Sequence, residues 1–98
     1  MRHIDRSLHR QVPRVLLELA ESGNCRLMSG FPNAHTYAVT THVGDYAAIS
    51  DAFARLFAWI ADNGFVSDGP PGDVYWDDPA VVPASELITV CYQPVRRA

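Results

Sequence analysis

A carboxylate and a phenol stand two residues apart in the segment Asp73-Val74-Tyr75. Side chains two positions apart on a β-strand lie on one face, so a strand here would place Asp73 beside Tyr75. A carboxylate next to an aromatic ring attracts a cation through its charge and through the electron-rich face of the ring. The same pair fits general acid–base catalysis, with the phenol orienting a substrate. It also fits a solvent-facing acid beside a tyrosine at the rim of a sheet, and the spacing leaves all three interpretations open.

Other chemistry-bearing patterns are missing or are typical of structural roles. The sequence has no glycine-rich phosphate loop, no serine or cysteine nucleophile motif and no HExxH pair. His35 and His42 are seven residues apart, which puts them on opposite faces of one strand and disfavours a two-histidine metal site there. The segment Asp77-Asp78-Pro79 is typical of a turn. We therefore expect no metal, no cofactor and no assignable catalytic residue.

The composition is that of one folded domain. The chain has 98 residues, of which 48% are hydrophobic and 19% are charged, and this excludes a disordered chain. No apolar run reaches the roughly 20 residues of a membrane span or the roughly 7 residues of a secretory signal core. We therefore expect a cytoplasmic protein with no membrane partner. Cys25 and Cys91 belong to no CxxC motif and are expected to be reduced thiols.

The charge distribution argues against direct DNA binding. The formal net charge is −3, and no segment resembles a helix-turn-helix. Four arginines near the N-terminus are spaced four residues apart and would line one face of a continuous helix: Arg2, Arg6, Arg10 and Arg14. Such a stripe could bind phosphates or an acidic partner. A solvated helix face is the more common explanation, and Pro13 argues against an unbroken helix through the stripe.

The order of the expected elements predicts the fold class. We expect a first helix within residues 6–22 that starts near residues 9–12, followed by strands at 25–29 and 35–43 that are joined by a turn at 31–33. A second helix is expected over 45–63, followed by a loop over 66–72. A strand at 73–76 and a last strand at 87–92, ended by Pro94, complete the order. This α-β-β-α-β-β order predicts an α+β fold, an antiparallel sheet with two helices packed on it. We expect one domain over residues 1–98, with an N-terminal helical segment at 1–23 and a sheet-helix-sheet unit at 24–98.

Several short motifs resemble, in their order and gaps, those of a known family. They are Tyr37-Ala38-Val39, His42-Val43-Gly44-Asp45-Tyr46, Leu56 with Trp59 and Ile60, Asn63-Gly64, Gly69-Pro70, Asp73-Val74-Tyr75, Asp78-Pro79, Glu86-Leu87 and Pro94-Val95. Over about residues 36–95 the chain resembles the GyrI-like small-molecule-binding domain, which also serves as the effector-binding domain of some AraC-type and MerR-type bacterial regulators. Asp73 stands where the family usually has glutamate, and Asp45 stands where proline is common.

The resemblance implies binding of a small aromatic or cationic molecule in a cleft. The cleft acid of the family maps to Asp73, and its aromatic lining maps to Tyr37, Tyr46, Tyr75 and Trp59. A stand-alone domain of this kind is expected to serve in transcription regulation or in sequestering a drug or toxin.

The resemblance also implies a partner. The family domain is built from two similar units around the cleft, and here the second unit is complete while the first is truncated. We therefore expect a homodimer in which two copies restore both walls of the cleft, the alternative being a monomer with a shallow groove.

Two other functions remain open at this point. The first is a protein-interaction module, such as a gyrase inhibitor or the partner of a regulator, that uses Arg6 and Arg10 or an exposed sheet edge. The second, suggested by some relatives, is a small hydrolase of reactive electrophilic compounds with Asp73 as the base and a tyrosine as its partner. That reaction would need Asp73 shielded from water so that its pKa rises toward the working pH.

Overall fold

The computed structural model describes residues 4–9, 11–30 and 35–98, and within them the chain forms the α+β fold that its sequence predicts. The helices are α1 (Arg14–Ser22) and α2 (Ile49–Asp62), and the strands are β1 (Cys25–Ser29), β2 (Thr36–Val43), β3 (Phe65–Ser67), β4 (Gly72–Tyr75) and β5 (Ile88–Arg97). Short 3-10 turns form η1 (Arg6–Leu8), η2 (Tyr46–Ala48) and η3 (Ala84–Glu86). The turn expected at residues 31–33 lies outside the described residues.

The sheet is antiparallel and is organised around β5. Its strand order is β1-β2-β5-β3, and β4 also pairs with β5. Residues 88–94 of β5 pair with β2 along one edge, while residues 89–92 pair with β4 and residues 95–97 pair with β3. β4 and β3 therefore follow one another along the second edge of β5.

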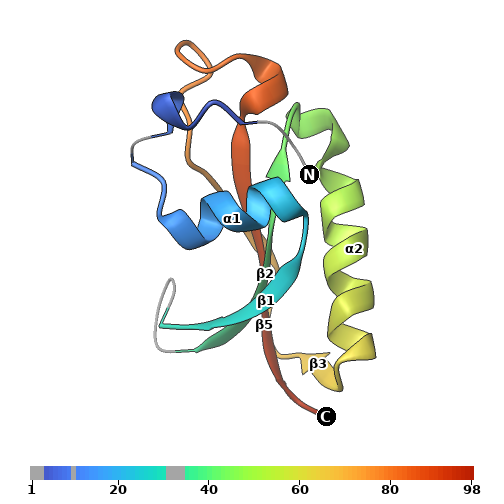
Figure 1. Cartoon of the computed structure of the whole chain (residues 1–98). Helices are drawn as coiled ribbons and strands as arrows, with labels where there is room; N and C mark the ends of the chain where they lie inside the picture. Colours follow the sequence, from blue (N-terminus) through green and yellow to red (C-terminus); the bar gives the residue numbers. More distant parts are fainter. Residues whose placement is uncertain (1–3, 10, 31–34) are drawn as a thin grey trace.

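The two helices cover opposite faces of this sheet, with α1 on one side and α2 on the other (Figure 1). The alternation of side chains along β2 explains this arrangement. Tyr37 and Val39 of β2 belong to the core with α1, whereas Ala38 between them belongs to the core with α2. Leu56 of α2 is fully buried against the second face. We call these two surfaces the α1 face and the α2 face of the sheet.

Helix α1 begins later than the sequence pattern predicts. The helix starts at Arg14, and the carbonyl of Pro13 accepts hydrogen bonds from the N–H groups of Leu16 and Leu17. Proline fits immediately before or at the start of a helix because its missing N–H would have no partner there. The helix ends at Ser22, and the positive φ of 74° at Gly23 suits a left-handed C-cap.

Two strand predictions need correction. Residues 65–67 form β3, although the loop was expected to begin at residue 66. The strand is hard to recognise in the sequence because it has three residues and lies next to a glycine-proline segment. The last strand does not end at Pro94 but runs to Arg97. Pro94 lies between the part of β5 that pairs with β4 and the part that pairs with β3, so its missing N–H breaks neither ladder.

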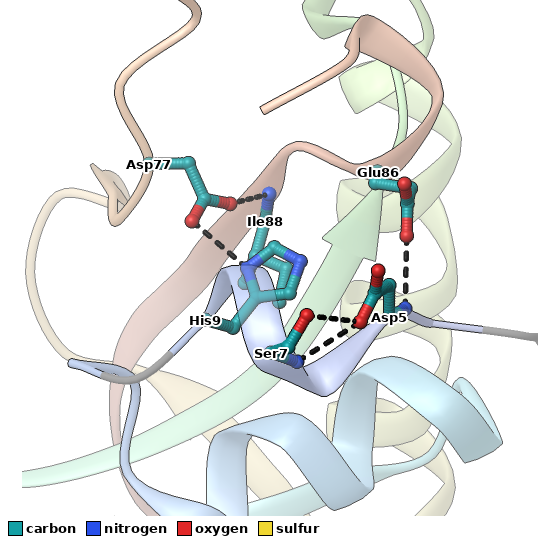
Figure 2. A network of polar contacts seen from close by, with 6 residues as sticks. All are labelled: Asp5, Ser7, His9, Asp77, Glu86 and Ile88. Carbon is teal, nitrogen blue, oxygen red and sulfur yellow. Dashed lines mark hydrogen bonds and ion pairs between the residues drawn. The ribbon is translucent and has the colours of Figure 1, made fainter. Parts of the chain in front are cut away.

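The N-terminal segment is fastened across the α1 face by polar contacts (Figure 2). The Nδ1 atom of His9 lies 2.9 Å from Asp77 Oδ1, and the Ile88 N–H donates to Asp77 Oδ2 at 2.6 Å. The side chains of His9 and Asp77 are 0% and 4% exposed. The Asp5 N–H also donates to Glu86 at 2.9 Å. Asp77 thus joins three parts of the chain, beyond the turn role expected of it.

The expected arginine stripe is not one helix face in the described residues. Arg6 lies in η1 and pairs with Glu21, while Arg14 opens α1 and lies 4.0 Å from Glu18. Arg2 and Arg10 lie outside the described residues.

Neither helix of the described ranges has the length and apolar character needed to cross a membrane.

Candidate functional site

Three of the five expected site residues gather at β4, on the α2 face. Asp73 pairs with Cys91 and Tyr75 pairs with Thr89 across to β5, so both side chains lie on the face that carries α2. The ring of Tyr46 lies 4.5 Å from the ring of Tyr75, measured between centroids. Tyr75 is 55% exposed, and Asp73 is exposed as well. We call Tyr46, Asp73 and Tyr75 the β4 shelf.

The other two expected residues lie elsewhere. Tyr37 is buried on the α1 face, where its ring meets the edge of Tyr92 with the centroids 5.5 Å apart. Trp59 of α2 is half-buried and stacks on Phe65 of β3 at 6.4 Å. One copy of the chain therefore does not bring all five residues into one cleft.

Local structure at the end of β2 positions Tyr46. The Asp45 side chain accepts a hydrogen bond from the Ala47 N–H at 2.9 Å and so caps η2. His42 Nε2 hydrogen-bonds to the Asp45 carbonyl at 2.8 Å. Asp45 thus caps the turn that presents Tyr46.

The surroundings of Tyr46 favour its protonated phenol. Partial burial, and then the proximity of Tyr75 and Asp77, raises the pKa of Tyr46 above its usual value. The shift reinforces the neutral form that a tyrosine already has at physiological pH, and this hydroxyl can donate a hydrogen bond. The exposed Asp73 carboxylate on the same face gives the shelf a negative charge that attracts a positive ligand group.

A polar floor lies beside the shelf, and the sequence patterns did not indicate it. Thr89 and Cys91 of β5 are fully buried, and the Oγ1 of Thr89 has no hydrogen-bond partner. Arg55 of α2 is half-buried, and its Nη2 donates to Thr40 Oγ1 at 3.1 Å. The spacing of Thr89 and Cys91 reveals a shared face, but their proximity to Asp73 depends on strand register, which this sequence does not show.

The chain matches the family of GyrI-like small molecule binding domains over residues 11–96. It is a member of that family. The matched range includes α1 and β1, which precede the motifs at residues 36–95. No curated protein and no solved structure matched the chain.

This GyrI-like domain also has a concave pocket on the α1 face, which we call the Tyr37 pocket. Its volume is about 330 Å³, and it is lined by His35, Tyr37, Asp68, Gly69, Pro70, Tyr92 and Pro94. A Cβ atom on Gly72 would lie 2.3 Å from the Tyr92 hydroxyl, so glycine is needed for that ring to take its place. The pocket and the β4 shelf each combine tyrosine rings with a carboxylate, on opposite faces of the sheet.

The pKa of the Cys91 thiol depends on the groups around the polar floor of the GyrI-like domain. Burial first, and then the charge of Asp73, raises the pKa of Cys91 to about 12, while Arg55 lowers it. We expect the folded protein near pH 8 to leave Cys91 unmodified by iodoacetamide, because the thiolate is the reactive form. Unfolding the protein should expose it to the reagent.

The same thiol tests whether Asp73 faces the floor. The negative charge of Asp73 disfavours the thiolate, so Asp73→Asn should lower the pKa of Cys91 and move its ultraviolet thiolate absorbance to lower pH. Asp62→Asn, at an exposed position near the end of α2, should leave that absorbance unchanged. If the thiolate absorbance of Cys91 has the same pH dependence in Asp73→Asn and Asp62→Asn, Asp73 does not lie close to the Cys91 thiol.

Proposed function

We propose that this GyrI-like domain binds small aromatic cations on the β4 shelf. The observation that carries the proposal is the pair of Tyr46 and Tyr75 rings, 4.5 Å apart, with the Asp73 carboxylate on the same face of β4. A cation over a tyrosine face gains about 0.5–1 kcal/mol at an exposed site, and a nearby carboxylate adds Coulomb attraction. A flat apolar ring on the ligand would cover the exposed surface of Tyr75.

We assign the ligand to the β4 shelf and not to the Tyr37 pocket for an electrostatic reason. Asp73 lies on the shelf and, among the described residues, has no cationic side chain within 4.0 Å. In the Tyr37 pocket the carboxylate is that of Asp68, which lies 4.0 Å from Arg96. The arginine partly neutralises that acid, so the shelf is the more favourable place for a cation.

A second copy of the chain completes the site in this proposal. Helix α2 packs mainly on β2, β3 and β5, so among the described residues it forms a wall on one side of the shelf. β4 is an edge strand whose pairing in the described structure is with β5. A homodimer would supply a second wall, and we place the biological role in ligand sensing for transcription regulation or in sequestering a drug or toxin.

Binding of phenethylamine, a small aromatic cation, tests the proposal. In a nitrogen–proton correlation NMR titration, Asp73→Asn and Tyr75→Ala should each weaken binding about 3- to 5-fold, as expected for contacts worth up to about 1 kcal/mol at an exposed site. Asp73→Glu should bind like the parent chain. The neutral analogue 2-phenylethanol should bind the parent and Asp73→Asn equally.

The matched control is Asp68→Asn, which removes the acid of the Tyr37 pocket and should leave phenethylamine binding unchanged. Light scattering on the same samples should give twice the chain mass of 10.8 kDa when phenethylamine is bound. If Asp68→Asn weakens binding and Asp73→Asn does not, the ligand site is the Tyr37 pocket and the shelf proposal is wrong.

A further inference from the structure

The positive charge of Arg55 lies on the same face of the sheet as the negative charge of Asp73. Thr40 of β2 pairs with Cys91 of β5, and Cys91 pairs with Asp73 of β4, so these three side chains form a row across the α2 face. Arg55 lies above this row, with its Nη2 donating to Thr40 Oγ1 at 3.1 Å. One end of the row therefore holds a guanidinium and the other end holds a carboxylate.

The guanidinium of Arg55 is poorly satisfied by the protein. It has five N–H donors, and within the described part of the chain the bond to Thr40 is the one that it makes. Its Nε is buried without a partner, and no described carboxylate lies within 4.0 Å of the group. A half-buried charge with a single neutral acceptor is costly, so the site favours an anionic or strongly accepting group from a ligand.

A second polar atom lies in the neighbouring row. Thr89 Oγ1 is buried without a partner, and Thr89 pairs with Tyr75 on one side and with His42 on the other. The hydroxyl can donate to an oxygen acceptor. Arg55 of α2 and Thr89 of β5 thus leave donors unsatisfied on the α2 face, the same face that carries the shelf.

We propose that the ligand of the β4 shelf is a zwitterionic aromatic molecule, of the class of aromatic amino acids. Its ammonium group faces Asp73, its ring packs on Tyr46 and Tyr75, and its carboxylate accepts hydrogen bonds from Arg55. This inference rests on the proposed function and adds the anionic half of the ligand to it.

The dimensions of the sheet agree with such a ligand. Neighbouring strands lie about 4.8 Å apart, so the row from Thr40 on β2 to Asp73 on β4 spans roughly 10 Å. The guanidinium reaches one end of this row from α2 and the carboxylate stands at its other end, so a ligand that carries both charges can face each of them. Arginine suits the carboxylate because its planar fork binds both oxygens.

The test compares phenylalanine with phenethylamine, which has the same ring and ammonium group but no carboxylate. The parent chain should bind phenylalanine about 5- to 10-fold more tightly, as expected for a charge-assisted hydrogen bond in a half-exposed site. Arg55→Gln should abolish this preference and leave phenethylamine binding at least as strong as in the parent. Arg55→Lys, which retains the charge without the fork, should retain part of the preference.

The outcomes separate this inference from the proposed function. If phenethylamine binds in an Asp73-dependent way but phenylalanine binds no more tightly, the zwitterion proposal is wrong and the aromatic-cation proposal stands. A preference for phenylalanine that survives Arg55→Gln also overturns the assignment of Arg55. If neither compound binds the parent chain, both proposals fail. Amide spectra of the unliganded variants show whether each is folded, and Arg55→Lys serves as the test if Arg55→Gln is not.

Discussion

Asp77→Ala is expected to lower the free energy of unfolding by about 2–6 kcal/mol, because each buried donor left without an acceptor costs about 1–3 kcal/mol. The carboxylate accepts from the Ile88 N–H at 2.6 Å and lies 2.9 Å from Nδ1 of His9 (Figure 2). Both groups lose their partner in the variant. Water cannot easily replace it, since the side chains of His9 and Asp77 are almost completely buried.

Urea denaturation followed by circular dichroism measures this loss. The matched control is Asp62→Ala, an exposed acid on α2, which should change the free energy of unfolding by less than about 0.5 kcal/mol. Amide hydrogen exchange should also accelerate at His9, whose N–H donates to the Arg6 carbonyl at 3.1 Å. If Asp77→Ala and Asp62→Ala unfold at the same urea concentration, the contact between His9 and Asp77 does not stabilise the fold.

Leu56→Ala is expected to cost about 2–5 kcal/mol, the usual range for removing a buried leucine side chain from a core. Leu56 is 0% exposed and lies in the core between α2 and the sheet, with Ala38 and Cys91. Neighbouring elements cannot collapse fully into the space, so the variant loses packing as well as apolar burial. A domain of this size has a stability of about 5–15 kcal/mol, so the loss is a large share of it.

Phe57→Ala is the control for this prediction, because the next residue of α2 is 42% exposed. Its ring contacts Phe53 with the centroids 5.9 Å apart, and its removal should cost less than about 1.5 kcal/mol. Thermal or urea unfolding of the two variants gives the comparison. If Leu56→Ala does not fold, Leu56→Val still permits a measurement. Equal losses at the two positions would place Leu56 outside the core.

The sequence was sufficient for the parts of the fold that depend on local patterns. The strand expected at residues 35–43 and the helix expected over 45–63 follow from the spacing of apolar residues, and the structure has β2 at Thr36–Val43 and α2 at Ile49–Asp62. β3 escaped prediction because three residues are too few to show a period. The passage of β5 through Pro94 depends on which neighbouring strand lies at that point, and this is a tertiary property.

The candidate site divides in the same way. The shared face of Asp73 and Tyr75 follows from their spacing, and the register confirms it. The contacts of Arg55 with Thr40 and of His9 with Asp77 join residues 15 and 68 positions apart, so no local pattern indicates them. The grouping of Tyr37 and Trp59 with the other aromatic residues came from family resemblance. One copy of the chain places them on other surfaces, and their part in ligand binding stays a prediction.

The position of β5 has a consequence for how the chain acquires its structure. β5 is the last strand in the sequence and the partner of β2, β3 and β4. Its pairing with β2 joins residues from Val43 with Ile88 to Tyr37 with Pro94, which requires closure of long loops. During synthesis, β2, β3 and β4 therefore cannot pair with β5 until residues 88–97 have left the ribosome. Until then the apolar side of α2 has no complete sheet to cover, and such exposed apolar surface favours aggregation of an incomplete chain.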